Sequence, residues 1–360
     1  MKGNKVVKVL HITSYPPPRS GWGIRVYFLK QEMERQGDIC EVLNTGKGRQ
    51  LKGRDFIPLY NGFDYVWKVF KYRLKGYLIH IHLNGDSPKK FIMTIIAQII
   101  SLLTFRRTVI TFHAGPVQRY FPQFKAPYLI PMYKFIFTEP KYIICNNEAV
   151  KKNIAGYGIH PDKIVPIQSF SKQYLQFHEV PFEGRVKTIF DTGDPVIVSY
   201  VYFRPEFFVH DLIRFFKQFV GKYPKAYLVI IGHESGSEPI KQLIDELRLN
   251  DRIYFAGDLD HDTFLTYLKR ATLFLRTPVK DGVCSSVLEA LALKTPVVAS
   301  ENGSRPEGVI TYQNGNIDDM VKKVQYVVEN LDAVRKQLKE PDIPDTVNQE
   351  IQLIRKAYWE

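Results

Sequence analysis

The stretch LFLRTPVKDGVCSSVLEALALKTPVVAS, residues 273–300, holds one complete strand–helix–strand unit. Apolar runs at 273–277 and 296–300 predict buried strands, and the leucines and alanines between them predict a helix over 286–293. Two strands that are joined through a helix in this way lie parallel in one sheet. The loop 277–286 therefore leaves the carboxyl end of a parallel strand, where open α/β sheets bind their ligands.

The same plan extends outward from this unit in both directions. Valine-rich and isoleucine-rich runs alternate with amphipathic stretches, a pattern typical of parallel sheets that helices cover on both faces. The sequence therefore predicts an α/β fold. We expect further strands at 6–13, 39–43, 78–83, 108–113, 142–147, 163–169, 195–200, 226–232 and 252–257, and further helices at 24–36, 208–221, 238–248 and 261–271.

The length of 360 residues favours two domains over one. We predict an N-terminal Rossmann-like domain over 1–180 and a C-terminal Rossmann-like domain over 190–335. Residues 179–194 lack clear periodicity and hold Pro and Gly, so we place the linker there. A final helix in 341–360 follows Pro341 and Pro344.

The composition excludes several classes of protein. Apolar residues make up 45% of the chain and charged residues 24%, as in globular proteins. The three cysteines stand far apart with no C-x-x-C pair, which argues against a disulfide framework or a zinc site and fits a reducing cytosol. The apolar run Phe91–Phe105 is shorter than the roughly 20 residues that span a bilayer, so it predicts a buried helix.

The net charge of +13 is unevenly distributed. Residues 1–180 hold 27 Lys+Arg against 11 Asp+Glu, whereas residues 181–360 hold 23 against 26. Basic and aromatic residues alternate in 67–77, and Lys89–Lys90 and Arg106–Arg107 flank the apolar helix. This pattern suits an anionic membrane face, and an ordinary solvated basic surface is the alternative. No nucleic-acid-binding module is recognised in the sequence, so we expect no nucleic-acid partner.

The loop after residue 277 carries the strongest chemical signal. Backbone amides at the start of a helix bind a diphosphate without a metal ion. Asp281 is placed to accept hydrogen bonds from a sugar, and Glu289 from the two hydroxyls of a ribose. A capping box, Ser286-x-x-Glu289, is the alternative; it explains these two residues but neither Asp281 nor the loop's length. The expected donor-binding residues here are Gly282, Val283, Cys284, Ser285 and Ser286.

A second loop, 14–23, joins the first strand to the first helix and contains Gly21 and Gly23. Glycines at a helix start let the backbone approach a phosphate, although a simple turn also uses them. The fingerprint G-x-G-x-x-G is missing because Tyr27 is not a glycine, and no acidic residue ends the second strand. Both departures argue against a dinucleotide-dependent dehydrogenase. Gly37 is typical of a helix C-cap.

Histidines and one acidic pair complete the set of candidates. His113 ends a strand in TFHAG, where it is placed to bond a sugar hydroxyl or to assist proton transfer. His80 and His82 share one strand face, and we interpret them as structural rather than as metal ligands. Asp258-Leu-Asp260 matches a D-x-D metal motif, but Asp260 precedes a helix and is interpreted as its N-cap.

These motifs together resemble the retaining glycosyltransferases of the GT-B fold, glycosyltransferase family 4. The family pattern E-G-F-G-x-x-x-L-E-A, followed by G-x-P-V-V-A, is similar to D-G-V-C-S-S-V-L-E-A and K-T-P-V-V-A here. The opening HITSYPPPRSGWGIRVYFLKQEMERQG and the segment TFHAG are similar to the family's first strand, glycine loop and T-x-H-G element. The resemblance covers about residues 5–330.

The resemblance implies a fold and a set of roles. Two Rossmann-like domains face each other across a cleft, and the last helix crosses back to the first domain. Glu289 binds ribose, Asp281 and the backbone of 283–285 bind the donor sugar and distal phosphate, and His113 contacts the sugar at the reaction centre. Gly21 and Gly23 line the phosphates. The family's cationic Arg–Lys pair is replaced by Arg204 alone, and its Asn-Gly by Gln168-Ser169-Phe170.

We therefore expect a retaining glycosyltransferase that needs neither a metal ion nor a cofactor. It uses a nucleotide-diphosphate sugar and a glycan or lipid-linked acceptor, in polysaccharide or cell-surface glycan biosynthesis. Its expected location is the cytoplasm, with peripheral binding to the inner face of the cytoplasmic membrane. The alternative, motivated by the missing lysine, is a catalytically weak GT-B subunit that acts as a binding component of a glycan assembly complex.

Overall fold

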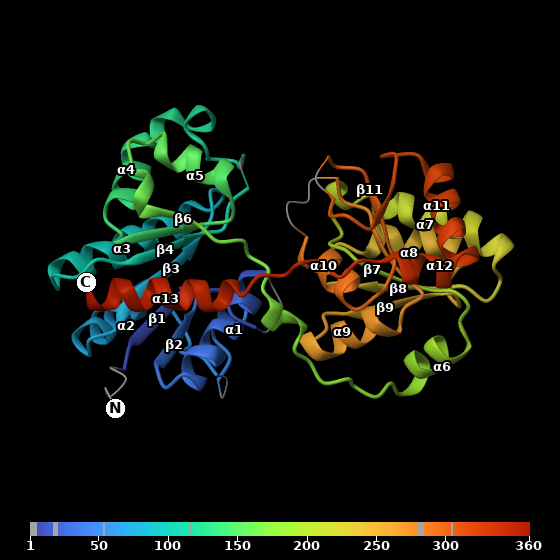
Figure 1. The fold of residues 1–360 in the computed structure, drawn as a ribbon, viewed down its shortest axis with the longest axis horizontal. Helices are drawn as coiled ribbons and strands as arrows, with labels where there is room; N and C mark the ends of the chain where they lie inside the picture. Colours follow the sequence, from blue (N-terminus) through green and yellow to red (C-terminus); the bar gives the residue numbers. More distant parts are fainter. Residues whose placement is uncertain (1–5, 17–20, 53–54, 116, 280–283, 304) are drawn as a thin grey trace. The chain divides into compact units, whose positions relative to one another are not determined.

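The computed structural model describes residues 6–16, 21–52, 55–115, 117–279, 284–303 and 305–360 (Figure 1). Two compact units divide the chain. Unit 1 comprises Met1–Gln173 together with Pro344–Glu360, and unit 2 comprises Tyr174–Ile343. Each unit has its own sheet and its own core, and each is described by itself below.

Unit 1 is built on a parallel six-stranded sheet in the order β2-β1-β3-β4-β5-β6. Side chains alternate between the two faces of a strand. In the strand 78–83, Ile79 and Ile81 therefore join the apolar core, whereas His80 and His82 lie on the opposite face. The strands are β1 (Lys8–Thr13), β2 (Ile39–Asn44), β3 (Leu78–Leu83), β4 (Val109–Phe112), β5 (Tyr142–Cys145) and β6 (Ile164–Pro166).

Helices from both ends of the chain cover this sheet. On the apolar face, α2 packs against α3 and α3 against α4. On the histidine-bearing face, the C-terminal helix α13, red in Figure 1, packs against α1. Gly37 follows α1 with φ +86°, which confirms its expected C-cap role. The helices are α1 (Gly21–Arg35), α2 (Gly62–Leu74), α3 (Pro88–Leu103), α4 (Ile130–Thr138), α5 (Glu148–Ala155) and α13 (Thr346–Trp359).

Unit 2 repeats the architecture with a parallel sheet in the order β12-β11-β10-β7-β8-β9. The α/β fold predicted from the alternation of apolar runs is therefore confirmed in both units. The last strand, β12, was not predicted, because its four residues carry too short an apolar run to be distinguished from a loop. The strands are β7 (Val196–Tyr200), β8 (Tyr227–Ile231), β9 (Ile253–Gly257), β10 (Leu273–Arg276), β11 (Val297–Ser300) and β12 (Val309–Tyr312).

The helices of unit 2 lie on both faces of its sheet. The helix α7 packs against α8 and α11, and α9 packs against α10. The aromatic stripe predicted for the first of these is core, since Phe215, Phe216 and Phe219 are fully buried. The helices are α6 (Gly184–Thr192), α7 (Val209–Lys222), α8 (Glu238–Glu246), α9 (His261–Arg270), α10 (Ser285–Ala292), α11 (Ile317–Glu329) and α12 (Leu331–Gln337).

Residues 179–194, which we expected to form an irregular linker, instead contain the helix α6 within unit 2. The reason is tertiary packing. Ile189 is buried, and Phe182 and Phe190 form an aromatic cluster with Tyr267 of α9. A short segment of weak periodicity becomes helical when such contacts order it.

The apolar run 91–105 is helical as predicted, but it is only half buried. Phe91, Ala97 and Ile100 join the core, whereas Ile92, Ile99 and Leu103 of the same helix are exposed. The expectation of a buried helix is therefore wrong for its outer face. Hydrophobicity alone did not distinguish the two faces, because both carry aliphatic residues.

Gly232 allows the backbone after β8 to lie close to the backbone after β7. A Cβ atom at Gly232, directly after β8, would lie 2.0 Å from the carbonyl oxygen of Val201, and its φ is +139°. We expect Gly232→Ala to lower the free energy of unfolding by about 3 kcal/mol, because both overpacking and backbone strain oppose it. Chemical denaturation measures the change.

Gly221→Ala is the matched control for that substitution. Gly221 lies in α7 and its Cβ would meet open space, so alanine there should stabilise the protein by about 0.5–1 kcal/mol. Equal stabilities of the two variants would contradict the close approach of the backbone at Gly232.

Candidate functional site

The predicted donor residues lie where β10 is followed by α10. Asp281, Gly282 and Val283 lie outside the described residues. Cys284 is the N-cap of α10, and Ser285 is its first residue. The carboxylate-bearing side chain of Glu289 is 1% exposed on the same helix, and Ser286 is also buried.

The capping box considered above is not formed. The helix begins at Ser285, one residue before Ser286, so Ser286 is not the N-cap, and the N-cap Cys284 makes no side-chain capping bond. Instead the Cys284 thiol and the Ser286 hydroxyl lie 3.1 Å apart. Glu289 is the fifth residue of the helix rather than a first-turn residue, so its burial has no explanation in capping.

An arginine that the sequence did not single out lies at the end of β10. The Arg276 guanidinium is nearly buried, donates to the carbonyl oxygen of Tyr200 at the end of β7, and lies 5.4 Å from the ring centre of Phe207. The neighbouring Thr277 hydroxyl donates to the Phe207 carbonyl at 2.5 Å. Arg204, the predicted cation, is exposed and lies 5.8 Å from the Tyr202 ring centre. Two cationic side chains therefore lie at the carboxyl ends of neighbouring strands, Arg276 as the last residue of β10 and Arg204 in the loop after β7.

The predicted residues of unit 1 also lie at the carboxyl ends of parallel strands. Gly21 opens α1, and a Cβ there would meet none of the described residues within 4 Å, so their packing does not require glycine at this position. Gly23 is buried one residue after Trp22. The Trp22 indole stacks on the His113 imidazole, with ring centres 4.9 Å apart and planes inclined by 13°. The first turn of α1 thus places an aromatic ring on the predicted catalytic histidine.

His113 is the outermost of four buried histidines on one sheet face. Its Nε2 lies 3.0 Å from Nδ1 of His82, and Nε2 of His82 lies 3.1 Å from Nδ1 of His11. The fourth, His80, points Nε2 at the Thr111 hydroxyl, 2.8 Å away. Register explains the cluster, because His11 is opposite His80 and His82 is opposite Thr111 in the parallel ladder.

The four imidazoles are neutral. Burial is the largest cause that lowers the pKa of each of them below the ordinary value, and charge on neighbouring groups adds to it. For His80 the pKa falls to about 3, with the Arg25 guanidinium as the second cause. Each ring therefore carries one N–H and one lone pair at physiological pH.

An ion pair between distant parts of the chain anchors this face. Arg25 of α1 donates through Nε to Glu350 of α13 at 2.5 Å, and through Nη1 to the carbonyl of Gln168 at 3.0 Å. The other carboxylate oxygen of Glu350 accepts from the Thr111 hydroxyl at 3.0 Å. The pair therefore fixes α13 on unit 1 directly above the histidine cluster.

The C-terminal half of the chain matches a known protein family. A family model described as glycosyl transferases group 1 matches residues 182–341. These residues are therefore similar to the glycosyl transferases of group 1, over less than half of the chain. The match lies within unit 2 and contains the whole segment from β10 to α10.

Individual relatives agree with this family. The chain is 24% identical over 266 residues to an uncharacterized glycosyltransferase of Methanocaldococcus jannaschii, covering 72% of this chain and 64% of the relative. It is 22% identical over 316 residues to the alpha-monoglucosyldiacylglycerol synthase of Streptococcus pneumoniae, covering 81% of this chain and 70% of that protein. The chain thus spans less than two thirds of the archaeal relative.

A solved structure identifies the fold. Anabaena HepE, crystallised in complex with UDP and glucose, superposes with a TM-score of 0.71 at 15% identity, over 98% of this chain and 100% of that one. This likeness confirms the GT-B fold that the sequence motifs implied.

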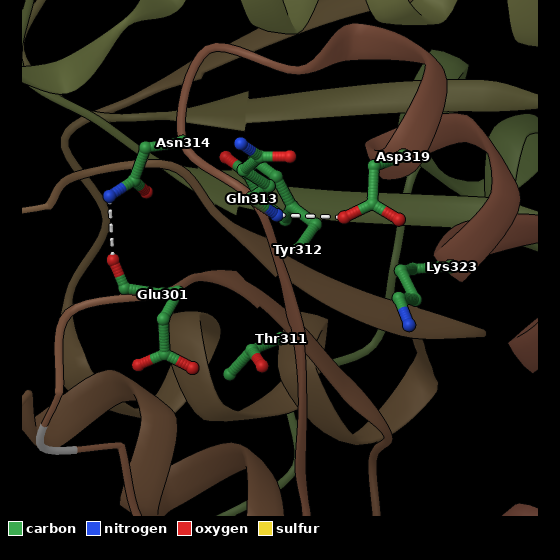
Figure 2. A pocket seen from close by; sticks show the side chains of 7 residues that line it. All are labelled: Glu301, Thr311, Tyr312, Gln313, Asn314, Asp319 and Lys323. Carbon is green, nitrogen blue, oxygen red and sulfur yellow. Dashed lines mark hydrogen bonds between the residues drawn. The ribbon is translucent and has the colours of Figure 1, made fainter.

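A separate cavity of about 470 Å³ lies in unit 2 at the edge of the sheet (Figure 2). Figure 2 shows the Asp319 carboxylate accepting from the backbone of Gln313 and the Asn314 amide donating to the carbonyl of Glu301. Two carboxylates and a single lysine do not suit a diphosphate. The lining residues are Glu301, Thr311, Tyr312, Gln313, Asn314, Asp319 and Lys323.

Two candidate metal positions can be tested against the geometry. Asp260 caps α9 by accepting from the backbone of Thr263 at 2.9 Å, which confirms the N-cap interpretation of the D-x-D segment. His11, His80 and His82 hold one ring nitrogen each within 4.8 Å of one another. Two of these rings already share a hydrogen bond, and the Arg25 charge acts on His80. The cluster therefore suits neutral hydrogen-bonded imidazoles better than a further cation.

Proposed function

We propose that the protein is a group 1 glycosyl transferase that moves a sugar from a nucleotide-diphosphate sugar to an acceptor, with retention at the anomeric carbon. The observation that carries the proposal is the buried carboxylate of Glu289, inside the family match and in the second turn of α10, the helix that follows β10. A buried carboxylate can accept hydrogen bonds from the two hydroxyls of a ribose.

The roles of the residues follow from their positions. Main-chain amides at the start of α10 bind the diphosphate, Glu289 binds the ribose, and Asp281 binds the transferred sugar. Arg276 and Arg204 supply positive charge near the departing diphosphate. No metal ion or cofactor is required in this scheme, because amides and guanidinium groups neutralise the leaving group.

Unit 1 binds the acceptor in this proposal, and His113 contacts the sugar at the reaction centre. The names of two solved and curated proteins support the substrate classes: Anabaena HepE binds UDP and glucose, and the pneumococcal relative is a synthase of a glycolipid. A glycan or lipid-linked acceptor of cell-surface glycan assembly in the cytoplasm fits both.

A thermal-shift series with nucleoside mono- and diphosphates tests the donor site. A diphosphate should raise the melting temperature because it binds the folded state alone. Glu289→Gln should weaken diphosphate binding about 10- to 100-fold, since a charge-assisted hydrogen bond contributes about 1.5–3 kcal/mol.

Glu246→Gln, an exposed change on α8 in the same unit, is the control and should bind as the wild type does. If no nucleoside diphosphate shifts the wild type, the alternative of a binding subunit without donor chemistry replaces the proposal. Equal affinities of Glu289→Gln and the control would remove the ribose role.

We also propose that the outer face of α2 and α3 binds an anionic membrane. Large apolar side chains recur on α2 at helical spacing, and they are strongly exposed: Phe63 is 90% and Trp67 is 61% exposed. On the adjacent α3 and just beyond it, Leu103 is 73% and Phe105 is 97% exposed. Exposed patches of this kind mark interaction sites.

Basic residues surround this patch, which favours a lipid surface over a neutral partner. Lys71 and Lys75 lie on or just after α2, and Arg106 and Arg107 follow α3, all exposed. Amphipathic surfaces with aromatic residues and cations bind anionic headgroups. Among the described residues, no helix combines the length and hydropathy needed to cross a bilayer.

Co-sedimentation with vesicles tests the membrane surface. We expect binding to vesicles with anionic lipid, and about a 10-fold loss for the double change Phe63→Ser, Trp67→Ser, because each buried aromatic contributes about 1.5–3 kcal/mol at most and partial insertion contributes less. Tyr326→Ser, which removes an exposed ring from unit 2, should have no effect. Equal binding to neutral and anionic vesicles would contradict the proposal.

A further inference from the structure

We propose that His82, supported by His11, is a positioning residue that holds His113 with its proton on Nδ1, so that His113 meets its ligand as a hydrogen-bond donor and not as a base. The inference rests on the proposed function for the role of His113. Its structural basis is the chain of ring nitrogens from His11 through His82 to His113.

Three contacts fix the His113 ring. Its backbone N–H donates to the Leu83 carbonyl at 2.8 Å, which sets the position of the residue beyond β4. Its Nε2 is 3.0 Å from His82 Nδ1, and the Trp22 indole stacks on its face. His113 is 6% exposed, and Nδ1 has no hydrogen-bond partner among the described residues. This nitrogen is the one left for a ligand.

Only two arrangements of the protons are possible along the hydrogen-bonded row His11, His82 and His113. Each neutral ring has one N–H, and His82 uses both of its nitrogens, so the protons point either all toward His113 or all toward His11. In the second arrangement the last N–H is on His11 Nε2, which is buried and has no partner among the described residues.

The first arrangement is favoured because buried N–H groups without an acceptor are rarer than acceptors without a donor. In that arrangement His11 donates to His82, His82 donates to His113, and the last N–H is on His113 Nδ1. This outer N–H is the one that a ligand or water can reach. His113 therefore presents a donor, suited to an oxygen atom of the sugar or acceptor.

His80 belongs to a separate branch, although it lies on the same strand as His82. Glu350 is ion-paired with Arg25, so its carboxylate accepts the Thr111 proton. The Thr111 oxygen therefore accepts from His80 Nε2. Among the described residues, no hydrogen bond joins this branch to His113, which makes His80 a control of equal burial.

Kinetics of three variants test the positioning role. His82→Phe keeps a ring of similar size but removes both nitrogens, and it should lower kcat about 10- to 100-fold, as losses of supporting hydrogen bonds do, with little change in the donor KM. His82→Gln can still donate to His113 and should recover most of the loss. His80→Phe should lower the melting temperature but leave kcat within about 3-fold, because it spares the His113 bond.

Nitrogen NMR of histidine-labelled protein gives a readout that needs no turnover. We expect the wild-type His113 signals to show a proton on Nδ1. In His82→Phe we expect the neutral His113 ring to exchange between two tautomers, with its single proton on Nδ1 or on Nε2. A wild-type proton on Nε2, equal kcat losses for His80→Phe and His82→Phe, or a metal ion that co-purifies with the histidine cluster would overturn the proposal. If no donor is turned over, the NMR result still decides the tautomer, so this failure is distinct from failure of the proposed function.

Discussion

Acidification from pH 6.5 to pH 5 should remove most of the stability of unit 1. The four buried histidines have a lowered pKa, so below pH 6.5 the unfolded chain binds protons that the folded chain does not. Stability is therefore complete above pH 6.5 and is lost as the pH falls. Each imidazole that stays neutral in the folded state lowers the free energy of unfolding by about 1–2 kcal/mol for each pH unit below 6.5. The four together lower it by on the order of 5 kcal/mol per pH unit.

This loss is large compared with the roughly 5–15 kcal/mol by which domains are stable. Charged groups around the histidines change their pKa values further. The positive charges of Arg25, Lys30 and Lys90 lower the pKa of the histidines near them, whereas the carboxylate of Glu350 raises the pKa of His11. For His80, whose pKa is about 3, the loss continues well below pH 5.

Chemical denaturation at pH 7.5, 6.5 and 5.5 measures this dependence. His11→Phe removes one buried site and should reduce the pH slope by about a quarter, because its share is one of four. His178→Ala, which removes a 99% exposed side chain, should leave the slope unchanged. A wild-type stability that is flat between pH 6.5 and 5.5 would show that the cluster protonates without cost.

His113→Ala should reduce kcat about 100- to 1000-fold, the loss expected when one preorganised hydrogen-bond donor is removed from a reaction centre. The ring is held from three sides before any ligand binds, so its hydrogen bond is made without a cost of reorganisation. The donor KM should change little, because in our proposal donor binding belongs to unit 2.

The control for that substitution is His160→Ala, an exposed histidine of the same unit whose side chain is 77% exposed. It should keep wild-type kcat. A His113→Ala enzyme that retains more than about a tenth of wild-type kcat would remove His113 from the reaction centre, since the loss of a preorganised donor exceeds that factor.

Much of the fold could be predicted because strands of parallel sheets, which are buried on both faces, consist of nearly continuous apolar residues. The unit from 273 to 300 is observed as β10, α10 and β11, with boundaries shifted by at most one residue. The helix α6 and strand β12 were missed for a physical reason. Their formation depends on contacts with distant residues, such as Tyr267 against Phe182, which local periodicity does not carry.

The candidate site was only partly predictable. The alternation in LIHIHL did place His80 and His82 on one strand face, and it could have indicated a polar layer. Their interpretation as structural histidines is incomplete, since His82 bonds His113 while His80 Nδ1 is buried without a partner among the described residues. The pairing of β1 with β3 and of β3 with β4 determines which of these histidines meet. Arg25 bonds Glu350, which lies 325 positions further along the chain.

Trp22 and Arg276 show a different limit. Both residues lie in segments that contain or adjoin predicted site residues. A tryptophan between two glycines and an arginine in an apolar strand do not, however, indicate which residues they contact. Only the fold shows that one stacks on His113 and the other bonds the end of β7.

The most direct test is turnover of nucleotide-diphosphate sugars with an extract-derived glycan or glycolipid acceptor, followed by the anomeric configuration of the product. We expect nucleoside diphosphate to be released in step with glycoside formation, without added metal and with the donor's configuration retained, and Glu289→Gln to slow it. A product of inverted configuration, or no nucleotide release from any common donor by a folded wild type, would contradict the account.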